Sequence, residues 1–492
     1  MSPAGPDRAL TVGLVLGVTV MAFGALAVVT VAPRIPAELG GFDRYGWLFS
    51  ANLLATLVGT VWGGVQADRH GPSRAFLAGL VAVIAGSAVA AAAPTIDVVV
   101  AGRVLQGLGS GSVVTCIYVA VSVAYPDAAR ARVLALLSSA WVLPALIGPA
   151  AAGVVAELAS WRWVFAALVP LAAVVAILTI PSFLALSARP ARRHVEAAQA
   201  RGTRGDRRVL VSLVLALGIG AGLWSASSGA PAPLRWLVAV VALGVALPSL
   251  ARLTPVGTLR FAPGLASAVA ARGLLFAGFI SVEVYLALML TEALGLSSTV
   301  TGLVIATGAL VWTAGSWTQA RLERARDAAA PAPWSRTLGV RRDLRVRIGV
   351  AVLGVGVLTQ VVALALAPSG GVALEGGAGP GAALLVAILG WALAGLGIGF
   401  AHASSSVLAF ECAEREGVEA GAVSSALQLS DGVASAVATG VAGALLALLT
   451  PQAGLGVGLA AAYGVGAAAV ALSLLAAWRI GAPPARSNPT AA

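Results

Sequence analysis

The feature that most constrains this chain is a long series of apolar runs. A helix that crosses a bilayer needs about 20 consecutive apolar residues, and about fourteen such runs occur here. They lie at residues 10–32, 45–65, 75–93, 98–120, 133–156, 163–186, 209–225, 234–250, 265–290, 300–319, 348–367, 382–403, 420–449 and 455–478. Only 10% of the 492 residues are charged, whereas soluble domains carry roughly a quarter. We therefore exclude a soluble protein and expect an all-α membrane protein.

The arginines between these runs indicate the orientation of the chain. The 31 basic residues are all arginines, and the net charge is +11. Arginine-rich loops follow the second, fourth, sixth, eighth and tenth runs, while the intervening loops carry few. Because cytoplasmic loops of membrane proteins are enriched in basic residues, we expect these loops and both termini on the inner side of the cytoplasmic membrane. The same placement argues against nucleic acid as a partner.

The runs divide along the chain into six, two and six. We expect a six-helix bundle (1–186), a cytoplasmic loop with two inserted membrane helices (187–260), a second six-helix bundle (261–480) and a disordered tail (481–492). The arginine-rich segments 187–208 and 320–347 are expected to be solvated surface loops, and the Gly-rich segment 368–380 a flexible external loop. Two six-helix halves are typical of transporters built from repeats, with the substrate site between them.

Several other classes of protein are disfavoured. Cys116 and Cys412 show no metal-ligand spacing, so neither a disulfide framework nor a metal site is indicated. The chain has no lysine, which rules out a G-x-x-x-x-G-K-[ST] nucleotide loop and disfavours an ATP-driven pump. The histidines His70, His194 and His402 are scattered, which argues against a membrane-embedded enzyme. We expect no metal and no cofactor.

The loop after the second run carries a recognisable motif. The sequence GGVQADRHGPSR contains Gly64, Asp68, Arg69, Gly71 and Arg74 in a G-x-x-x-D-R-x-G-x-x-R pattern. Gly64 is expected to permit close helix approach, and Gly71 a tight turn. Asp68 lies at a helix end, where a carboxylate can meet a neighbouring helix N-terminus or an arginine.

Two further patterns lie in the fourth and fifth runs. Arg103 and Gln106-Gly107 form an R-x-x-Q-G pattern, followed by Gly109 and Gly111. The fifth run contains Pro144, Gly148, Pro149 and Gly153. Such glycines let helices slide closely past each other, and proline bends a helix because it lacks a backbone donor.

Taken together, the three motifs resemble those of the major facilitator superfamily, and with about 14 runs the chain resembles its fourteen-helix drug:proton antiporter branch. The resemblance covers nearly the whole chain, and Gly315 to Arg321 echo the first motif with Gln319 at the position of Asp68. It implies a fold of two six-helix bundles plus two inserted helices, powered by the proton gradient. It also implies export of hydrophobic or amphipathic compounds, as in multidrug resistance. We expect a monomer in contact with membrane lipid.

One departure from the family directs attention to other acids. That branch usually carries an aspartate in its first helix, but Gly24 occupies this position here. Glu283, in the ninth run, is then the leading candidate for a carboxylate that alternates between protonated and ionised forms. Asp431 is either a second titrating site or a structural bond between helices, and counting residues places it at a depth similar to that of Glu283. Arg103 is either a proton-relay cation or a structural arginine.

Other side chains are candidates for a substrate cavity. We assign Tyr285, Trp391, Gln106 and Phe279 to it, while His402 is interpreted as a packing residue. The sequence thus predicts a secondary active transporter that works by alternating access, with the residues around Asp68 as an inner gate latch. A dedicated exporter of an endogenous metabolite or lipid remains the alternative within transport. A channel is disfavoured by the repeated loop motif.

Overall fold

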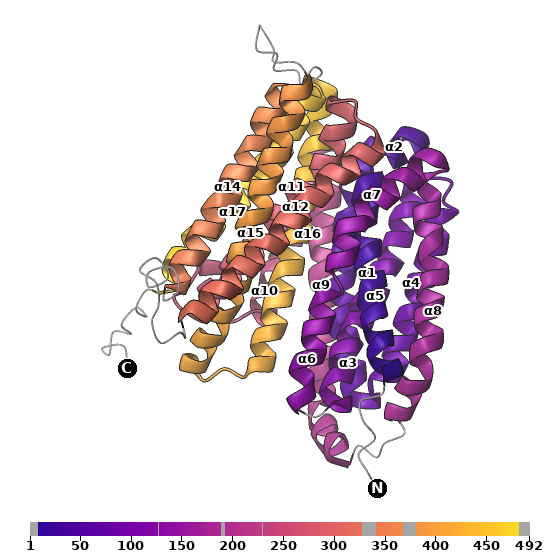
Figure 1. Cartoon of the computed structure of the whole chain (residues 1–492), viewed down its shortest axis with the longest axis vertical. Coiled ribbons are helices and arrows are strands. Elements are labelled where there is room, and N and C mark those ends of the chain that lie inside the picture. The colour runs from indigo at the N-terminus through magenta and orange to yellow at the C-terminus, as the bar shows by residue number, and fades with distance from the viewer. Residues whose placement is uncertain are drawn as a thin grey trace.

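The structure of this protein is a computed structural model that describes residues 8–125, 127–187, 192–228, 230–326, 341–367 and 380–481. Within these residues the chain folds into helices joined by turns and short connections, and no strand occurs among them (Figure 1). Thirteen helices are long and apolar enough to cross a membrane, and the shorter apolar helix Val142–Leu158 joins them. The prediction of an all-α membrane protein with about 14 spans is confirmed.

The helices follow the expected order. The amino half comprises α1 (Arg8–Val31), α2 (Arg34–Leu39), η1 (Phe42–Arg44), α3 (Trp47–His70), α4 (Pro72–Ala91), α5 (Ile96–Ala124), α6 (Asp127–Ser139), α7 (Val142–Leu158) and α8 (Trp161–Ser187). The inserted pair is α9 (Arg192–Ser227) and α10 (Ala232–Leu253), followed by η2 (Thr258–Arg260). The carboxy half comprises α11 (Leu265–Leu288), the π-helix η3 (Met289–Ala293), α12 (Ser298–Arg326), α14 (Arg342–Ala365), α15 (Pro380–Glu416), α16 (Ala420–Ala453) and α17 (Leu455–Arg479).

The two halves repeat the same packing. In the amino half α5 packs against α3 and α4, and in the carboxy half α15 packs against α12 and α14. The halves meet along α7 with α12 and along α3 with α16. Figure 1 shows them side by side, the amino half in indigo and magenta and the carboxy half in orange and yellow.

Glycines of the R-x-x-Q-G motif explain the tight packing of α5. A β-carbon at Gly107 would lie 2.3 Å from the carbonyl oxygen of Asn52 on α3. One at Gly109 would lie 2.4 Å from the carbonyl oxygen of Gly79 on α4. No larger side chain fits at these contacts, so α5 is held against two neighbours by backbone contact.

The fifth predicted span is broken rather than continuous. The run 133–156 forms α6 and α7, separated by a turn at Ala140 and Trp141. Pro144 has no N–H to donate to the carbonyl of Ala140, so the helix is interrupted there. The hydroxyl of Thr19 on α1 lies 3.4 Å from that carbonyl and donates to it.

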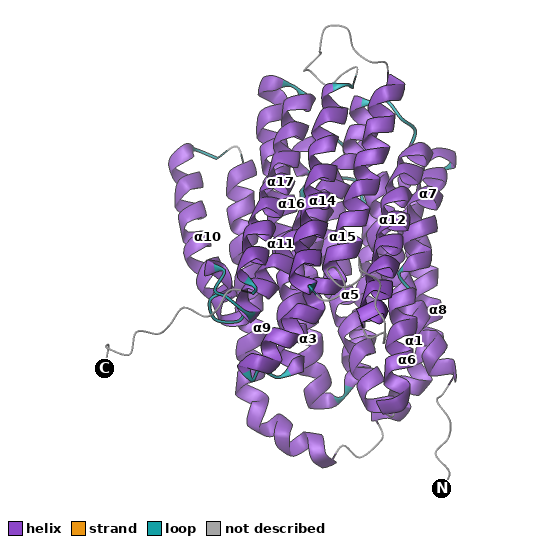
Figure 2. Ribbon diagram, turned by 60° about the vertical axis from the view of Figure 1, so that its left-hand side comes forward, coloured by secondary structure: helices purple, strands orange, loops and turns teal. Residues whose placement is uncertain are grey.

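The inserted pair differs from its prediction at one end. The segment 187–208, expected to be a loop, is helical from Arg192 as the first part of α9. α9 packs against both α3 and α16, so it touches both halves, whereas α10 packs mainly on α9. Figure 2 shows α10 at the edge of the molecule, and only 11% of the residues in its apolar 18-residue stretch are buried. α10 is thus a lipid-facing helix. Of the expected loop 320–347, residues 320–326 belong to α12 and 342–347 to α14, so these parts are helical instead. Residues 327–340, residues 368–379 of the expected Gly-rich loop and the tail from 482 lie outside the described residues.

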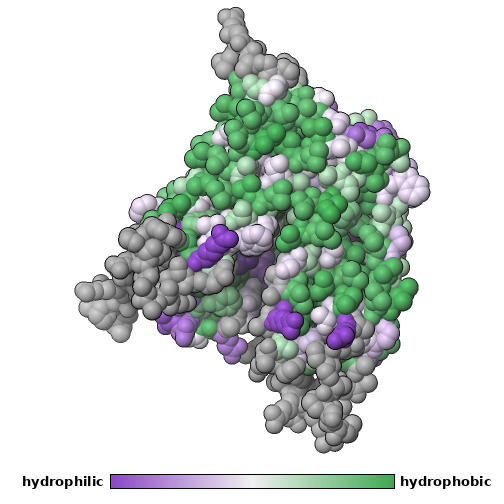
Figure 3. Space-filling model, viewed as in Figure 1, coloured by the Kyte–Doolittle hydropathy of each residue, from purple (hydrophilic) through white to green (hydrophobic). Residues whose placement is uncertain are grey.

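The two ends of the molecule differ. We call the end where α3 passes into α4, at residues 68–74, the motif end. The halves diverge toward it in Figure 1, and Figure 3 shows a hollow between them on that side. At the other end, the closed end, Tyr45 and Gly46, which directly precede α3, lie against α11 and α16.

Candidate functional site

One face of α11 carries the charged and aromatic residues of the candidate site. Arg272, Phe276, Phe279 and Glu283 recur every three or four residues and therefore share a face. We call these four residues the α11 stripe. Arg272 and Phe276 are partly exposed, whereas Phe279 is 2% and Glu283 6% exposed. The stripe thus becomes more buried from the motif end toward the closed end.

Arg272 holds Asp431 at one end of the stripe. Its Nη2 lies 2.8 Å and its Nε 3.1 Å from Asp431 Oδ2, and Nη1 donates to the Ser406 hydroxyl at 2.6 Å. These bonds join α11, α15 and α16. Asp431 is therefore part of a bond between helices, as one of the two sequence interpretations had it. Sequence reasoning missed Arg272, although its spacing from Glu283 places the two on one helix face.

His402 is not the isolated packing residue that the sequence indicated. Its Nε2 lies 3.7 Å from Asp431 Oδ2 and makes no hydrogen bond among the described residues. Its ring centroid lies 5.6 Å from that of Phe276 and 6.0 Å from that of Trp312. His402 therefore links the ion pair to the aromatic part of the site.

Aromatic rings fill the middle of the stripe. Phe279 stacks on Trp391, with centroids 4.6 Å apart, and meets Trp312 edge-on at 5.1 Å. Trp391 is fully buried and donates its Nε1 hydrogen to the carbonyl oxygen of Ile305 at 3.0 Å. Two of the predicted cavity residues, Phe279 of the stripe and Trp391, are thus packed against each other.

Glu283 differs from Asp431, the other buried acid among the described residues, because its carboxyl group has no partner. It is 6% exposed, and no hydrogen bond or ion pair to its carboxyl group occurs among the described residues. A carboxylate without a partner inside a membrane protein is costly and marks a functional position. Glu283 is therefore the described acid best suited to take up and release a proton.

The expectation that Glu283 and Asp431 lie at similar depth is wrong. Asp431 is bonded to Arg272, and Glu283 lies three helical turns further along α11, roughly 16 Å at 1.5 Å per residue. Glu283 lies 18 residues after the start of α11 at Leu265, whereas Asp431 lies 11 residues after the start of α16 at Ala420. The two acids therefore occupy opposite ends of the stripe.

Arg103 and Gln106 are tied into the amino half. Arg103 Nε donates to the carbonyl oxygen of Leu48 at 3.0 Å, and Nη1 donates to Gln106 Oε1 at 2.9 Å. Gln106 in turn donates to Ser87 at 2.9 Å. These bonds link α3, α4 and α5, and none joins Arg103 to Glu283 among the described residues. The structure favours the structural interpretation of Arg103.

Tyr285 lies at the closed end rather than beside the other cavity candidates. It is fully buried, and its hydroxyl donates to the carbonyl oxygen of Thr439 at 2.6 Å. The same hydroxyl covers the contact between Gly46 on the amino side and Gly443 on α16. A β-carbon at Gly46 would lie 2.8 Å from the Cα atom of Gly443. The halves are sealed here by backbone contact.

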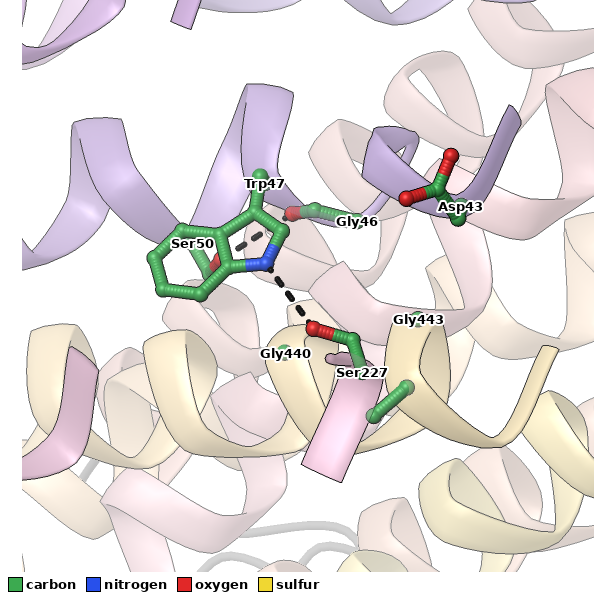
Figure 4. A pocket seen from close by; sticks show the side chains of 8 residues that line it. Asp43, Gly46, Trp47, Ser50, Ser227, Gly440 and Gly443 are labelled. Atoms are coloured by element: carbon green, nitrogen blue, oxygen red, sulfur yellow. Dashed lines mark hydrogen bonds between the residues drawn. The ribbon is translucent and has the colours of Figure 1, made fainter. Parts of the chain in front are cut away.

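A small cavity borders this seal. Its empty volume, including space open to solvent, is about 200 Å³, and its walls come from η1, α3, α9 and α16 (Figure 4). Trp47 points across it and donates to the Ser227 hydroxyl at 3.4 Å. The inserted helix α9 thus lines the junction of the two halves.

The motif of the fifth span forms a second seam between the halves. A β-carbon at Gly153 on α7 would lie 2.4 Å from the carbonyl oxygen of Ser298 on α12. One at Gly302 would lie 2.2 Å from the carbonyl oxygen of Pro149. The predicted close helix contact at Gly153 is confirmed, and it joins the two halves. Gly148 makes only an ordinary contact with Phe23, 3.5 Å from its β-carbon position.

The first motif is only partly as predicted. Gly71 has φ +78°, a value that glycine tolerates best, and it leads into α4 as expected. The close contact predicted for Gly64 falls one residue earlier. A β-carbon at Gly63 would lie 2.8 Å from the Cα atom of Ser112, whereas one at Gly64 would meet Thr115 at 3.7 Å.

The charged residues of this motif lie apart from the α11 stripe. Asp68 and Arg74 are exposed at the open motif end, and no partner of Asp68 occurs among the described residues. Arg69 Nη1 pairs with Asp206 Oδ1 of α9 at 2.8 Å. The arginine of the motif is thus tied to the inserted helix.

The echo of this motif in the carboxy half belongs to a charge cluster that sequence reasoning missed. Gln319 donates to Glu323 at 3.3 Å. Arg342 on α14 pairs with Glu323 at 2.7 Å and also with Glu411 on α15. Arg345 pairs with Glu323 as well. The cluster binds α12, α14 and α15 together at the motif end.

Gly24, which replaces the acid of the family pattern, faces an apolar neighbour. A β-carbon there would lie 3.2 Å from Leu168 Cδ1. A side chain at this position would therefore crowd an apolar neighbour.

Comparison with known families gives a match over most of the chain. The sequence model of the Major Facilitator Superfamily matches residues 14–379. Multidrug resistance protein 3 of Bacillus subtilis (strain 168) is 29% identical over 164 residues, which are 33% of this chain and 32% of that protein. A probable multidrug-efflux transporter of Mycobacterium tuberculosis (strain CDC 1551 / Oshkosh) is 33% identical over 174 residues, 35% of this chain and 37% of that protein. The chain thus spans about a third of the length of these curated relatives.

Solved structures share the fold. A D-xylose-proton symporter superposes with a TM-score of 0.61 at 14% identity, covering 97% of this chain and 98% of that one. A POT family transporter in complex with 5-aminolevulinic acid superposes with a TM-score of 0.64 at 15% identity, covering 96% and 95%. At these identities the likeness concerns the fold alone.

Proposed function

Because the chain belongs to the Major Facilitator Superfamily, we propose that it is a proton-coupled antiporter that expels hydrophobic or amphipathic small molecules. It is a multi-pass membrane transporter rather than an enzyme. Export is supported by relatives named as multidrug resistance and efflux proteins. The observation that carries proton coupling is Glu283, which is buried without a partner.

The difference between the two ends supports a direction for the cycle. The motif end faces the cytoplasm of the cell by the arginine rule, so this conformation faces inward. Asp68 is exposed because the latch that it forms with its neighbours is released in this state. Both termini lie in the cytoplasm, and the protein works as a monomer in the cytoplasmic membrane.

Proton and substrate exchange at the stripe. In the inward-facing state the Glu283 carboxyl group releases its proton to cytoplasmic water, and substrate enters along the aromatic rings of Phe279 and Trp391. The loaded protein closes its motif end and opens the other end. There a proton from outside binds the Glu283 carboxylate and substrate leaves. The protonated protein then returns to the inward-facing state.

Asp431 has a different role from Glu283. Its charge is balanced by Arg272, so a proton there would leave the arginine without its counter-charge. An ion pair inside a membrane protein is stable only while both partners remain. Asp431 therefore stays ionised and fixes α11 against α16, while Glu283 carries the proton. The energy source is the proton gradient.

The test is transport in proteoliposomes with an imposed pH gradient and a panel of fluorescent dyes. Glu283→Gln is expected to abolish proton-driven uptake into inverted vesicles while expression stays normal. Glu292→Gln is the matched control, because Glu292 is exposed in the segment that follows α11. Wild-type proton dependence in Glu283→Gln would refute the proposal.

A further inference from the structure

The closed end contains a hydrogen bond that links the two halves directly beside Glu283. The hydroxyl of Tyr45, between η1 and α3, donates to the carbonyl oxygen of Val284 on α11 at 2.9 Å. Tyr45 is fully buried, and its ring lies 5.9 Å from that of Tyr285. The residues flanking Val284 are therefore the proposed proton carrier and the tyrosine of the seal.

Tyr45 belongs firmly to the amino half. Its ring lies 5.7 Å from that of Phe49 on α3. The carbonyl of Leu48 accepts a hydrogen bond from Arg103, which fixes the first turn of α3 to α5. Any movement of α11 at residue 284 relative to the amino half must therefore break or bend the Tyr45 bond.

The same segment of α11 is joined to the carboxy half by two other hydroxyl groups. Tyr285 donates to Thr439 on α16, and the Tyr463 hydroxyl on α17 lies 3.3 Å from the carbonyl oxygen of Tyr285. These two bonds stay within the carboxy half. Of the three tyrosines, Tyr45 alone crosses between the halves.

A change in backbone geometry follows this segment. α11 gives way to the π-helix η3 at Met289. Single π turns within helices are frequently found at functional sites, because they break the regular hydrogen-bond ladder locally. The part of α11 that carries Glu283 thus lies between a tie to the amino half and a local change of helix type.

We propose that Tyr45 is the positioning residue that couples the charge of Glu283 to closure of this end, an inference that rests on the proposed function. When Glu283 is protonated, the neutral side chain tolerates the closed interior and the Tyr45 bond to Val284 forms. When Glu283 is ionised, burial is costly, and the backbone at residue 284 moves as the charge seeks water or a substrate. The bond breaks and this end opens once substrate is bound.

Other ionisable groups do not explain such coupling. Near the stripe, the described groups on the elements packed against α11 are Asp431 and His402, Glu292 in η3 and the phenol of Tyr463, with the phenol of Tyr45 before α3. The remaining ones lie toward the motif end: Arg8, Arg260, Arg321, Glu323, Arg342, Asp343, Arg345, Arg347, Glu411, Cys412, Glu414, Arg415, Glu416 and Arg479. His402 lies beside Asp431, at the other end of the stripe from Glu283. The phenols stay neutral below about pH 10. Asp431 is paired with Arg272, and Glu292 is exposed. Glu283 is the unpaired acid beside the Tyr45 bond.

The test measures closure of this end by cross-linking. Asp43 and Ala444 line the same small cavity from opposite halves. Cysteines placed there, with Cys116 and Cys412 replaced by alanine, are joined by a short bismaleimide in the full-length protein, with a transported dye present. The cross-linking yield is measured between about pH 5 and about pH 9, a range wide enough to cover the titration of a carboxyl group with a shifted pKa. We expect several-fold higher yield at the acidic end.

Tyr45→Phe should remove most of this pH dependence, because it deletes the hydroxyl and keeps the ring. Turnover should fall several-fold with little change in substrate affinity. Tyr463→Phe is the matched control, since its hydroxyl bonds only within the carboxy half, and it should keep the pH dependence. Gly46→Ala, whose β-carbon would collide with Gly443, should lower the yield at every pH.

The outcomes separate the two proposals. If Tyr45→Phe keeps the parent pH dependence while Glu283→Gln loses it, the role of Tyr45 is refuted and proton coupling by Glu283 stands. If Glu283→Gln keeps the pH dependence, coupling by Glu283 itself is refuted. Should Tyr45→Phe fail to fold, Tyr45→Met provides the second variant, because its flexible apolar side chain fills the site without a hydrogen-bond donor. Parent-like pH dependence in Tyr45→Met would refute the role equally.

Discussion

Arg272 on α11 binds Asp431 on α16 through two nitrogens, with Nη2 at 2.8 Å and Nε at 3.1 Å from Oδ2. This pair gives the two buried acids described in the carboxy half different roles. Asp431 has its counter-charge, whereas Glu283 has none among the described residues. The charge that is free to change with the transport cycle is therefore that of Glu283.

The ion pair gives the first prediction. Arg272→Gln or Asp431→Asn leaves one charge without its partner, which costs about 3–5 kcal/mol in a fully buried pair. Because the two side chains keep 13% and 12% exposure, we expect about 2–4 kcal/mol. The double variant, which removes both charges, should recover much of the loss. Thermal unfolding in detergent measures this, and a double variant as unstable as the two single losses combined would contradict it.

Gly24 gives a second prediction. Gly24→Asp restores the acid of the family pattern but places it against Leu168, with the β-carbon 3.2 Å from Cδ1. Overpacking costs about 1–3 kcal/mol, and the carboxyl group would stand against an apolar side chain. We expect lower stability and no rescue of proton-driven transport in the Glu283→Gln background. Gly24→Ala separates crowding from charge. Recovered transport in the Gly24→Asp, Glu283→Gln double variant would show that the first helix accepts the coupling acid.

The seam between α7 and α12 gives a third prediction. Gly153→Ala puts a β-carbon 2.4 Å from the carbonyl oxygen of Ser298, so the halves must separate there. This overpacking destabilises the conformation in which α7 and α12 are in contact by about 1–3 kcal/mol. We therefore expect the turnover rate to fall. Gly148→Ala is the control, because its β-carbon would make an ordinary 3.5 Å contact with Phe23. Equal dye-transport rates in the two variants would count against this role.

The motif end gives a fourth prediction. Asp68→Asn should slow turnover with little effect on substrate affinity. Asp68 is exposed in this conformation, and the proposed latch with its neighbours forms only in the outward-facing conformation. Asp97→Asn, an exposed aspartate at the opposite end, is the control. Initial rates over a range of substrate concentrations separate the two effects. Loss of affinity at normal turnover would contradict the latch role.

The sequence predicts those features that depend on local chemistry. Hydropathy locates the spans, the glycine of the tight turn is found at Gly71, and the close contact at Gly153 follows from the motif. The Arg272–Asp431 pair could not be found in this way, because the two residues are 159 positions apart. Their contact depends on the rotation of two helices about their axes, which hydropathy leaves open. Residue counting also misses the relative depth of Glu283 and Asp431, because that depth depends on how α11 and α16 are shifted along each other.

The contact between α2 and the start of α8 gives the last prediction. Trp161 Nε1 donates to Glu38 Oε2 at 2.6 Å, and Arg162 pairs with the other oxygen of Glu38, so α2 is fixed to the start of α8. The hydrogen bond from Arg162 lowers the pKa of Glu38 below its ordinary value of 4.5. A lowered folded-state pKa stabilises the fold above the unfolded value, and this stability is lost as the pH falls through the folded value.

For this reason Glu38→Gln should lower the melting temperature by a constant, small amount above about pH 5, and the difference should vanish toward about pH 3. The side chain is half exposed, so the contribution is about 1 kcal/mol or less. Asp43→Asn is the control variant, because Asp43 is exposed and pairs with Arg44, which also pairs with exposed Asp97. Melting curves of the purified protein at a series of pH values measure the effect. A difference that grows as the pH falls would mean that the Glu38 pair destabilises the fold.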